Sequence, residues 1–260
     1  MTRLILGLLA VLVAAPAGSA QGQHPREDGR VPVLAELFTA EGCSSCPPAD
    51  RLLEMVSKEQ PLEGVYVVAL SEHVTYWDHQ GWKDPFGSAQ FTARQNKYGY
   101  RFHLDSIFTP QLVIDGRTQM VGSDAAQLKI ALAESARTPK PRLVVEAIVD
   151  ERGSLTASVS GPGLDAGEGG AAELLWAVTE DDLTVDVKRG ENAKRTLRHS
   201  GVVRTLVVRK IDRPTASPLT AVIPLRPEWK RENLRLVAFV QSTNSGRVLS
   251  VGWSRLPASR

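Results

Sequence analysis

Apolar and polar residues follow two different patterns in the two halves of this 260-residue chain. In the first half, short apolar runs alternate with segments that have one apolar face at helical spacing. The runs at 31–38 and 65–70 are typical of strands covered on both faces, and the segment 49–58 has the period of a helix. The other elements predicted in this half are a helix over 86–98, strands at 112–114 and 118–121, and a final helix capped by Ser123 or Asp124.

The second half has the pattern of a series of short strands. It begins after Thr-Pro-Lys-Pro at 138–141, which is extended because a residue before proline avoids the helical region. Clusters of glycine and proline then separate apolar segments without a helical period. The predicted strands are 142–149, 154–160, 172–179, 184–188, 202–210, 219–224, 234–241 and 247–253. The two patterns predict an α/β domain over 31–139 and a β-sandwich-like domain over 142–260.

The N-terminal segment has the composition of a secretory signal. Arg3 precedes an apolar stretch from 4 to 16, and the small residues at 18–20 resemble a cleavage site. The stretch is shorter than the roughly 20 residues that a membrane-spanning helix needs. We therefore predict a signal peptide at 1–20, a flexible leader at 21–30, a periplasmic or secreted location, and no membrane span after cleavage. An uncleaved N-terminal anchor is the alternative.

The charge of the chain argues against nucleic acid as a partner. Residues 21–140 carry a net charge of −3, from 12 basic and 15 acidic residues, and residues 141–260 carry +4, from 18 basic and 14 acidic residues. Neither value is that of a strongly basic protein. One stretch, 188–210, holds eight basic residues and a single acid, Glu191. It is either a docking surface for an envelope partner or an ordinary solvated face.

Cys43 and Cys46 are the only cysteines, and they stand where the first predicted strand turns into the first helix. Their spacing allows a tight disulfide, and the position at the turn predicts an exposed Cys43. A bridge that closes so short a loop removes little entropy from the unfolded chain. This favours a reactive pair, although a structural disulfide also persists in an exported protein. Ser44 and Ser45 are candidate hydrogen-bond donors to a Cys43 thiolate.

Several motifs together resemble one family of secreted bacterial proteins with a thioredoxin-like domain, known only as a domain of unknown function. The motifs stand at 36–39, 42–50, 73–78, 81–82, 91–95, 109–111, 190–192, 198–199 and 204. The resemblance covers essentially the whole mature chain. It implies that the N-terminal domain is thioredoxin-like, with a central mixed sheet flanked by helices.

The resemblance also assigns roles to a second loop. In thioredoxin-like folds a cis proline lies beside the cysteine pair, and Pro110 is that residue here. It leaves the backbone of Thr109 free to pair with a substrate peptide. Cys43 is then the attacking thiol and Cys46 the resolving one. The prolines after Cys46 favour a helix that starts directly behind it, with Cys46 itself outside the helical region.

His73 and Trp77 belong to an aromatic-rich stretch after the second predicted strand, which opens on the same side as Cys43. His73 is a candidate for stabilising a thiolate or moving a proton, and the alternative is a buried histidine with satisfied partners. Trp77 either covers the sheet or assists at the site. Two thiols and His73 also form a set that suits Cu(I) or zinc, as in secreted thioredoxin-like copper chaperones.

The sequence thus predicts an exported thiol–disulfide oxidoreductase or thiol-redox protein. It would act on protein thiols and disulfides through Cys43 and Cys46, with no other cofactor. Two alternatives stand beside it. One is a periplasmic metal-binding or copper-chaperone protein that uses Cys43, Cys46 and His73. The other is a non-enzymatic envelope module with a structural disulfide.

Overall fold

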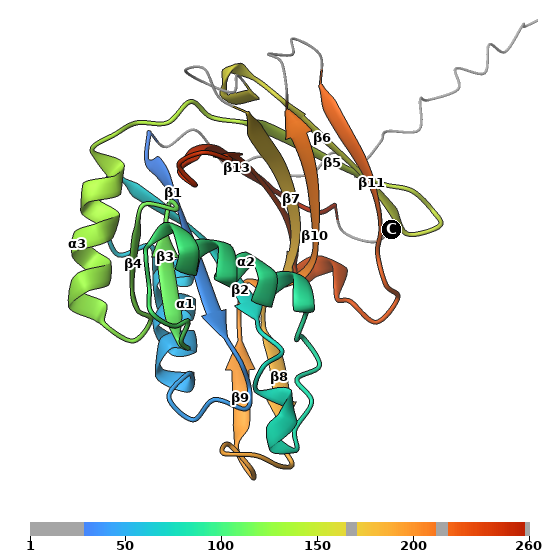
Figure 1. Ribbon diagram of the computed structural model, residues 1–260. Coiled ribbons are helices and arrows are strands. Elements are labelled where there is room, and N and C mark those ends of the chain that lie inside the picture. Colours follow the sequence, from blue (N-terminus) through green and yellow to red (C-terminus); the bar gives the residue numbers. More distant parts are fainter. Residues whose placement is uncertain (1–28, 165–170, 212–217, 258–260) are drawn as a thin grey trace, which may run out of the picture.

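The computed structural model describes residues 29–164, 171–211 and 218–257, which contain three α-helices and thirteen strands (Figure 1). Eight strands form one mixed sheet in the order β13-β12-β7-β10-β2-β1-β3-β4. Three more form a sheet in the order β11-β6-β5, and β8 pairs with β9 in a hairpin. None of the helices in these ranges is long and apolar enough to cross a membrane. The predicted signal peptide and most of the leader lie outside the described residues.

The N-terminal half supplies four strands of the main sheet. Its elements are β1 (Val31–Thr39), α1 (Pro47–Glu59), β2 (Val65–His73), α2 (Ala89–Arg101), β3 (Gln111–Ile114), β4 (Thr118–Val121) and α3 (Ala125–Ala136). β1 pairs in parallel with β2 and antiparallel with β3, which in turn pairs with β4. Each element falls where the sequence pattern predicts one. Asp124 caps α3, because its side chain accepts a hydrogen bond from the Gln127 amide.

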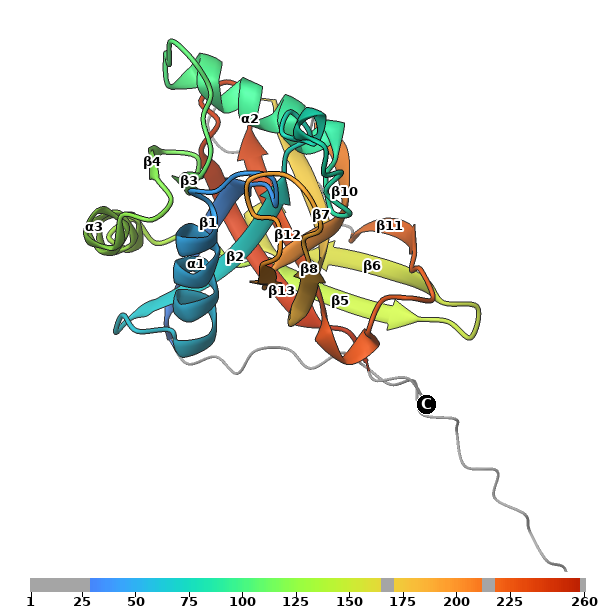
Figure 2. The same ribbon diagram turned by 90° about the horizontal axis from the view of Figure 1, so that it is seen from below.

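β1 is buried on both faces, as its continuous apolar run predicts. Val33, Ala35 and Leu37 pack with α1 and α3, whereas Leu34 packs with Phe91 of α2 on the opposite face. The alternation arises because successive side chains of a strand point to opposite sides of the sheet. Figure 2 shows α2 lying across the sheet, away from α1 and α3.

The C-terminal half continues the same sheet. Its elements are β5 (Val144–Val149), β6 (Ser154–Ser160), β7 (Ala172–Glu180), β8 (Leu183–Asp186), β9 (Thr196–His199), β10 (Val202–Ile211), β11 (Leu219–Pro224), β12 (Leu234–Ser242) and β13 (Val248–Arg255). β10 joins the N-terminal strands through a parallel pairing of Val202 with Ser71 of β2. Gly201 permits this approach, since its φ is +67° and a Cβ there would lie 3.0 Å from the Ala69 carbonyl oxygen.

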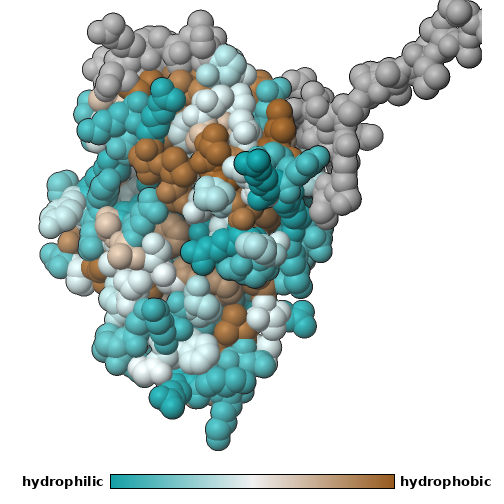
Figure 3. Space-filling model, turned by 90° about the vertical axis from the view of Figure 1, so that its right-hand side faces the viewer, coloured by the Kyte–Doolittle hydropathy of each residue, from teal (hydrophilic) through white to brown (hydrophobic). Residues whose placement is uncertain are grey.

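The sheet β11-β6-β5 packs on the C-terminal part of the main sheet. Leu174 and Trp176 of β7 belong to the core between the two sheets, whereas Leu175 of the same strand belongs to the core with α2. The outward side of the smaller sheet exposes Ile148 and Val222. Figure 3 shows apolar residues gathered on this side of the molecule.

The predicted fold class is wrong. In place of an α/β thioredoxin-like domain and a separate β-sandwich-like domain, the chain has a mostly β architecture in which one eight-stranded mixed sheet runs through both halves. Local periodicity located eight C-terminal strands and missed β9. It does not encode which strands pair across the chain, such as β10 with β2. The division into 31–139 and 142–260 stays a prediction, and the main sheet takes strands from both sides of it.

Candidate redox site

Residues 40–46 connect β1 and α1, and in them Cys43 and Cys46 form a disulfide; we call this segment the redox loop after the role that the sequence predicts for it. α1 begins at Pro47, as predicted, and Cys46 is its N-cap residue. Cys46 has helical backbone angles, φ −77° and ψ −37°, contrary to the expectation that the following proline excludes them. Its carbonyl oxygen accepts the amides of Ala49 and Asp50 at 2.8 and 3.1 Å, which holds it in the first helical turn.

Neither sulfur is at the surface. Cys43 and Cys46 both have 0% exposure, so the prediction of an exposed Cys43 is wrong. Ser44 and Ser45 form the surface of the redox loop instead. Ser45 Oγ lies 3.4 Å from Cys43 Sγ, a contact that the sequence anticipated, while Ser44 turns to a partner in the C-terminal half. The cysteines are covered by segments that are distant in the sequence.

Trp77 lies in the first of these covering segments. It links the redox loop to the loop before β3. Its Cβ lies 3.1 Å from the position of a Cβ on Gly42, and its indole Nε1 donates a 2.8 Å hydrogen bond to Thr109 Oγ1. The Thr109–Pro110 bond is cis, as the resemblance implies. Within the described residues, the backbone N–H and C=O of Thr109 form no hydrogen bond. The predicted disulfide, Trp77 and Thr109-Pro110 therefore do lie on one side of the molecule.

The second segment over the redox loop is the tip of the β8–β9 hairpin, which belongs to the C-terminal half. Asn192 is fully buried there, and its Nδ2 donates to the carbonyl oxygens of Glu41 at 2.8 Å and Cys43 at 2.9 Å. The Glu191 carboxylate accepts the Ser44 amide at 3.0 Å. These hydrogen bonds join residues 147 to 151 positions apart. Burial of the disulfide is therefore a long-range property, which the local turn does not reveal.

Five buried ionisable side chains gather beside the redox loop, and we call them the buried acid–imidazole cluster: Glu41, Asp50, His73, Asp84 and His199. His73 Nδ1 lies 2.7 Å from Asp84 Oδ2, which also accepts the Glu41 amide at 2.8 Å. His199 Nε2 lies 3.4 Å from Glu41 Oε1, and its Nδ1 lies 4.0 Å from Asp50 Oδ2. The two imidazole rings meet edge to face at 4.9 Å. The sequence singled out His73; His199 stands in the motif at 198–199 without an assigned role, and Asp84 stands in none of the motifs.

The electrostatics of the cluster favour a charged His73. Burial opposes its charging, but attraction to Asp84 and the hydrogen bond that His73 donates to Asp84 outweigh burial and raise the pKa of His73. Burial likewise opposes ionisation of Asp84, but His73 and two backbone amides lower the pKa of Asp84 below its ordinary value. At Asp50 burial dominates and raises the pKa against the attraction of both imidazoles. A His73–Asp84 ion pair thus lies beside an acid that tends to keep its proton.

A second buried network ties the two halves together. Arg94 of α2 donates from Nε to Glu36 at 2.7 Å and from Nη1 to Gln241 of β12 at 3.0 Å. Tyr98 donates to Glu36 and accepts from Gln241 at 2.8 Å. Burial, with the nearby Glu36, raises the pKa of Glu72 well above its ordinary value despite the attraction of Arg94. The Arg94 guanidinium therefore contacts two buried carboxyl groups, and burial favours the neutral form of Glu72.

The alternative metal set is not brought together. Within the described ranges, no three His, Cys, Asp or Glu side chains are arranged to hold a metal ion. The described contacts of the His73 ring are with Asp84, Phe86 and His199, none of which is a cysteine. His73 is buried and belongs to the acid–imidazole cluster. The copper set of Cys43, Cys46 and His73 therefore does not form in this structure.

Fold and site together define a mostly β protein with a buried disulfide directly after β1, an interior strand of its main sheet. The chain belongs to the family DUF1223, described as a protein of unknown function, whose model matches residues 34–241. That range includes the redox loop, the hairpin and the buried acid–imidazole cluster. The predicted membership of a family of unknown function is confirmed. Nothing in the comparisons supports the thioredoxin-like superfamily. Among curated proteins, none matches the chain.

Two solved structures share the fold over most of the chain. An X-ray structure of a protein from Agrobacterium tumefaciens is 26% identical, with a TM-score of 0.64 over 89% of this chain and 96% of that one. HBP35 of Porphyromonas gingivalis is 13% identical, with a TM-score of 0.52 over 87% of this chain and 76% of that one. The second likeness concerns the fold alone.

Proposed function

We propose that the chain is an exported thiol-redox protein whose Cys43–Cys46 disulfide exchanges with thiols of partner proteins. The observation that carries the proposal is that three parts meet: the disulfide, the unpaired backbone of Thr109, and the buried acid–imidazole cluster. A disulfide in so short a loop adds little stability, which favours a chemical role over a structural one. The predicted signal peptide places the protein in a periplasmic or secreted setting, where such a pair stays oxidised.

Exchange requires access, so the hairpin tip moves off the redox loop first. A partner thiolate then attacks Cys43 Sγ, a mixed disulfide forms, and Cys46 leaves as a thiolate. A second thiolate of the partner attacks the partner's own sulfur in the mixed disulfide and releases Cys43 as a thiolate. The partner departs with a disulfide, and two electrons remain on the cysteine pair. The reverse sequence reduces a partner disulfide.

Two groups assist this exchange in the proposal. The free N–H and C=O of Thr109 pair with an extended segment of the partner, as an unpaired strand edge does. Asp50 supplies a proton to the released Cys46 thiolate, since it lies in the first turn of α1 and burial raises its pKa. Neither group is itself a nucleophile in this exchange.

The hairpin surface suits an acidic partner. The basic stretch 188–210 divides in the structure, because Arg204 is half-buried and pairs with Glu180 at 3.5 Å, whereas the hairpin residues point to solvent. The exposed basic residues of the hairpin are Lys188, Arg189, Lys194, Arg195 and Arg198. Their position over the redox loop brings an acidic protein surface to the disulfide by long-range attraction.

The test is turnover with a protein disulfide. The full mature chain should accelerate insulin reduction by dithiothreitol, and Cys43→Ala and Cys46→Ala should each abolish the acceleration. Ser44→Ala is the matched control in the same loop and should keep most of the activity. Equal rates with and without the wild-type chain would refute the proposal, as would full activity of both cysteine variants.

One observation favours a second candidate, an envelope module with an inert disulfide. Both sulfurs have 0% exposure, which is typical of structural bridges. In that case the disulfide resists millimolar dithiothreitol for as long as the protein stays folded. The two functions therefore predict opposite results: a redox disulfide is reduced in the folded protein, and an inert disulfide is not.

A further inference from the structure

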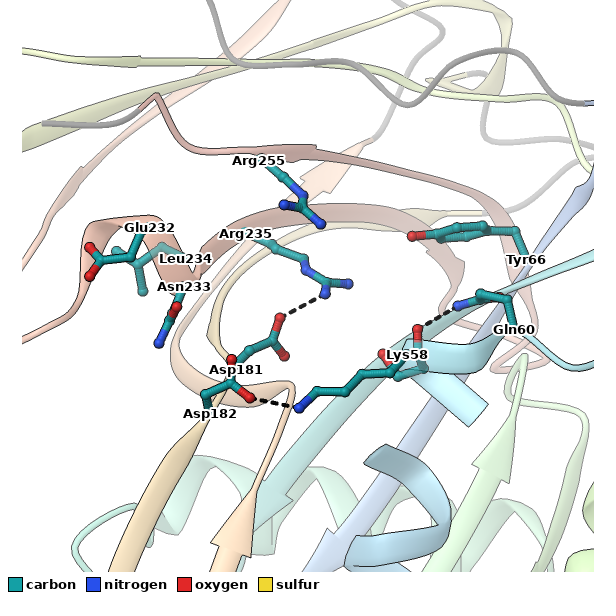
Figure 4. A pocket seen from close by; sticks show the side chains of 11 residues that line it. Lys58, Gln60, Tyr66, Asp181, Asp182, Glu232, Asn233, Leu234, Arg235 and Arg255 are labelled. Carbon is teal, nitrogen blue, oxygen red and sulfur yellow. Dashed lines mark hydrogen bonds and ion pairs between the residues drawn. The ribbon is translucent and has the colours of Figure 1, made fainter. Parts of the chain in front are cut away.

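A polar pocket of about 410 Å³ lies at the opposite end of α1 from the disulfide (Figure 4). It is walled by the end of α1, the start of β2, the β7–β8 turn, the η3 turn (Arg231–Asn233) and the facing strands β12 and β13. Its volume falls in the range of small-molecule sites. The length of α1 separates it from the redox loop by about 20 Å. It is thus a separate site.

Two arginines meet at one wall of this pocket. Arg235 of β12 and Arg255 of β13 are directly opposite in the antiparallel register. Like charges at opposite positions destabilise a sheet unless an anion lies near them. Arg235 is balanced by Asp181 at 2.7 Å. Within the described residues, the Arg255 guanidinium forms neither an ion pair nor a hydrogen bond. This wall therefore carries one arginine charge, that of Arg255, which no described carboxylate balances.

Tyr66 presents a rigid hydroxyl to the same space. Its ring stacks on Trp253 with centroids 5.1 Å apart, and the Arg30 guanidinium lies 4.9 Å from its centroid on a face of the ring. In Figure 4 the phenol oxygen points into the pocket, toward the two arginines. It has no hydrogen-bond partner among the residues that the structure describes. Arg255, Arg235 and the Tyr66 hydroxyl are donors of the kind that bind a carboxylate.

The opposite wall carries acids. Asp182 accepts from Lys58 at 2.6 Å, and Glu232 and Asn233 lie across the pocket from Tyr66 (Figure 4). A polyanion such as a nucleotide would be repelled by these carboxylates, together with Asp181. A simple cation would be repelled by the arginines. Only a ligand with separated charges of both signs complements both walls.

We propose that this pocket binds a small zwitterion of amino-acid or dipeptide size, with its carboxylate at Arg235, Arg255 and Tyr66 and its ammonium group at Asp182. Arg235 remains paired with Asp181 and offers its outer N–H groups. Arg255 supplies the uncompensated charge, and the Tyr66 hydroxyl fixes the direction of the carboxylate. The pocket binds without any change at the disulfide.

The experiment is calorimetric titration of the full mature chain with L-alanine and L-alanyl-L-alanine. One of these probes should bind at a single saturable site. The blocked forms N-acetyl-L-alanine and L-alanyl-L-alanine amide, which each lack one charge, should bind at least about tenfold more weakly. Arg255→Gln and Tyr66→Phe should weaken binding of the zwitterion by a similar factor. Arg226→Gln, at an exposed arginine outside the pocket, is the matched control and should bind like wild type.

Thermal unfolding of each variant checks that it is folded, and Tyr66→Phe keeps the stacked ring in place. The proposal is overturned if neither zwitterion binds at millimolar concentration. It is also overturned if the blocked forms bind as tightly as the zwitterions, or if folded Arg255→Gln and Tyr66→Phe both bind like wild type. The redox activity of these variants is a separate measurement and does not enter this test.

Discussion

At the scale of single residues, the His73–Asp84 pair shows how burial and charge oppose each other beside the redox loop. Both side chains are buried, yet each favours the charged form of the other: the 2.7 Å contact outweighs burial, so the pKa of His73 is raised and that of Asp84 is lowered. Removing one partner of such a pair leaves an uncompensated buried charge. The pair is therefore a sensitive point for stability and for its dependence on pH.

Asp84→Asn should lower the free energy of unfolding by about 3 kcal/mol at pH 5.5. The raised pKa of His73 means that its contribution is fully present below about pH 6.5 and is lost as the pH rises through the folded value. The lowered pKa of Asp84 means that its contribution is lost only when the pH falls below about 4. Urea unfolding at pH 5.5 and pH 9 should show a smaller loss at pH 9. The same loss at both pH values, with exposed His79→Asn as control, would contradict this.

Glu72→Gln should flatten the dependence of stability on pH. Burial raises the pKa of Glu72, so its protonated form favours the folded state at low pH, and that advantage is lost as the pH rises through the folded value. The neutral amide cannot titrate, and the variant should lose less stability than wild type between pH 5 and pH 9, by about 1.4 kcal/mol for each unit of pKa shift. Urea unfolding across this range is the measurement. Exposed Glu63→Gln should keep the wild-type slope of stability against pH. An unchanged slope in Glu72→Gln would contradict a raised pKa of Glu72.

At the scale of elements, we propose that the β8–β9 hairpin controls access to the disulfide. Asn192 holds its tip on the redox loop through two hydrogen bonds, and Arg195 Nη1 donates to Asn192 Oδ1 at 3.0 Å to orient the amide. Such a segment opens locally more often than the whole protein unfolds. The proposal therefore assigns the opening motion to the hairpin.

Asn192→Ala should speed reduction of the disulfide by dithiothreitol about tenfold or more. Each lost hydrogen bond is worth about 1 kcal/mol, so the open state becomes more populated. The rate is read by alkylation of the released thiols and mass spectrometry. Arg189→Ala, at an exposed residue of the same hairpin, should react like wild type. If Asn192→Ala is reduced no faster than Arg189→Ala, the hairpin does not control access.

Most elements were predictable from the sequence, because strand and helix periods are local, but β9 was missed. The strand 31–39 and the helix from Pro47 follow directly from apolar spacing and proline placement. The covering of Cys43 was not predictable, since Asn192 reaches it from 149 positions away. His199 was missed for the same reason, as its neighbours Glu41 and Asp50 are brought to it only by the fold.

At the scale of the whole molecule, one sheet connects the two halves of the chain. The pairing of β10 with β2 and the buried Arg94 network both cross the predicted boundary near residue 140. The sequence pattern suggested two units because the helices end where the run of strands begins. The order of strands within a sheet is set by contacts between distant residues, such as Val202 with Ser71, and these leave no periodic trace.

Gly201→Ala should destabilise both halves together. Its φ of +67° disfavours a side chain by roughly 1–2 kcal/mol, and the new Cβ would crowd the Ala69 carbonyl oxygen at 3.0 Å. Denaturation followed by circular dichroism and by tryptophan fluorescence should give one shifted transition. Gly64→Ala has a similar φ but open space around its Cβ, so it should shift the transition less. Two separate transitions, with only one of them moved, would show independent halves.

The central claim is that the Cys43–Cys46 disulfide is covered at rest yet able to exchange in the folded protein. The most direct test compares its reduction rate in native buffer with the rate of global unfolding under the same conditions. We predict that reduction is much faster than unfolding and rises with dithiothreitol concentration, because the hairpin opens locally. A reduction rate equal to the unfolding rate and independent of dithiothreitol would contradict the account and identify an inert disulfide.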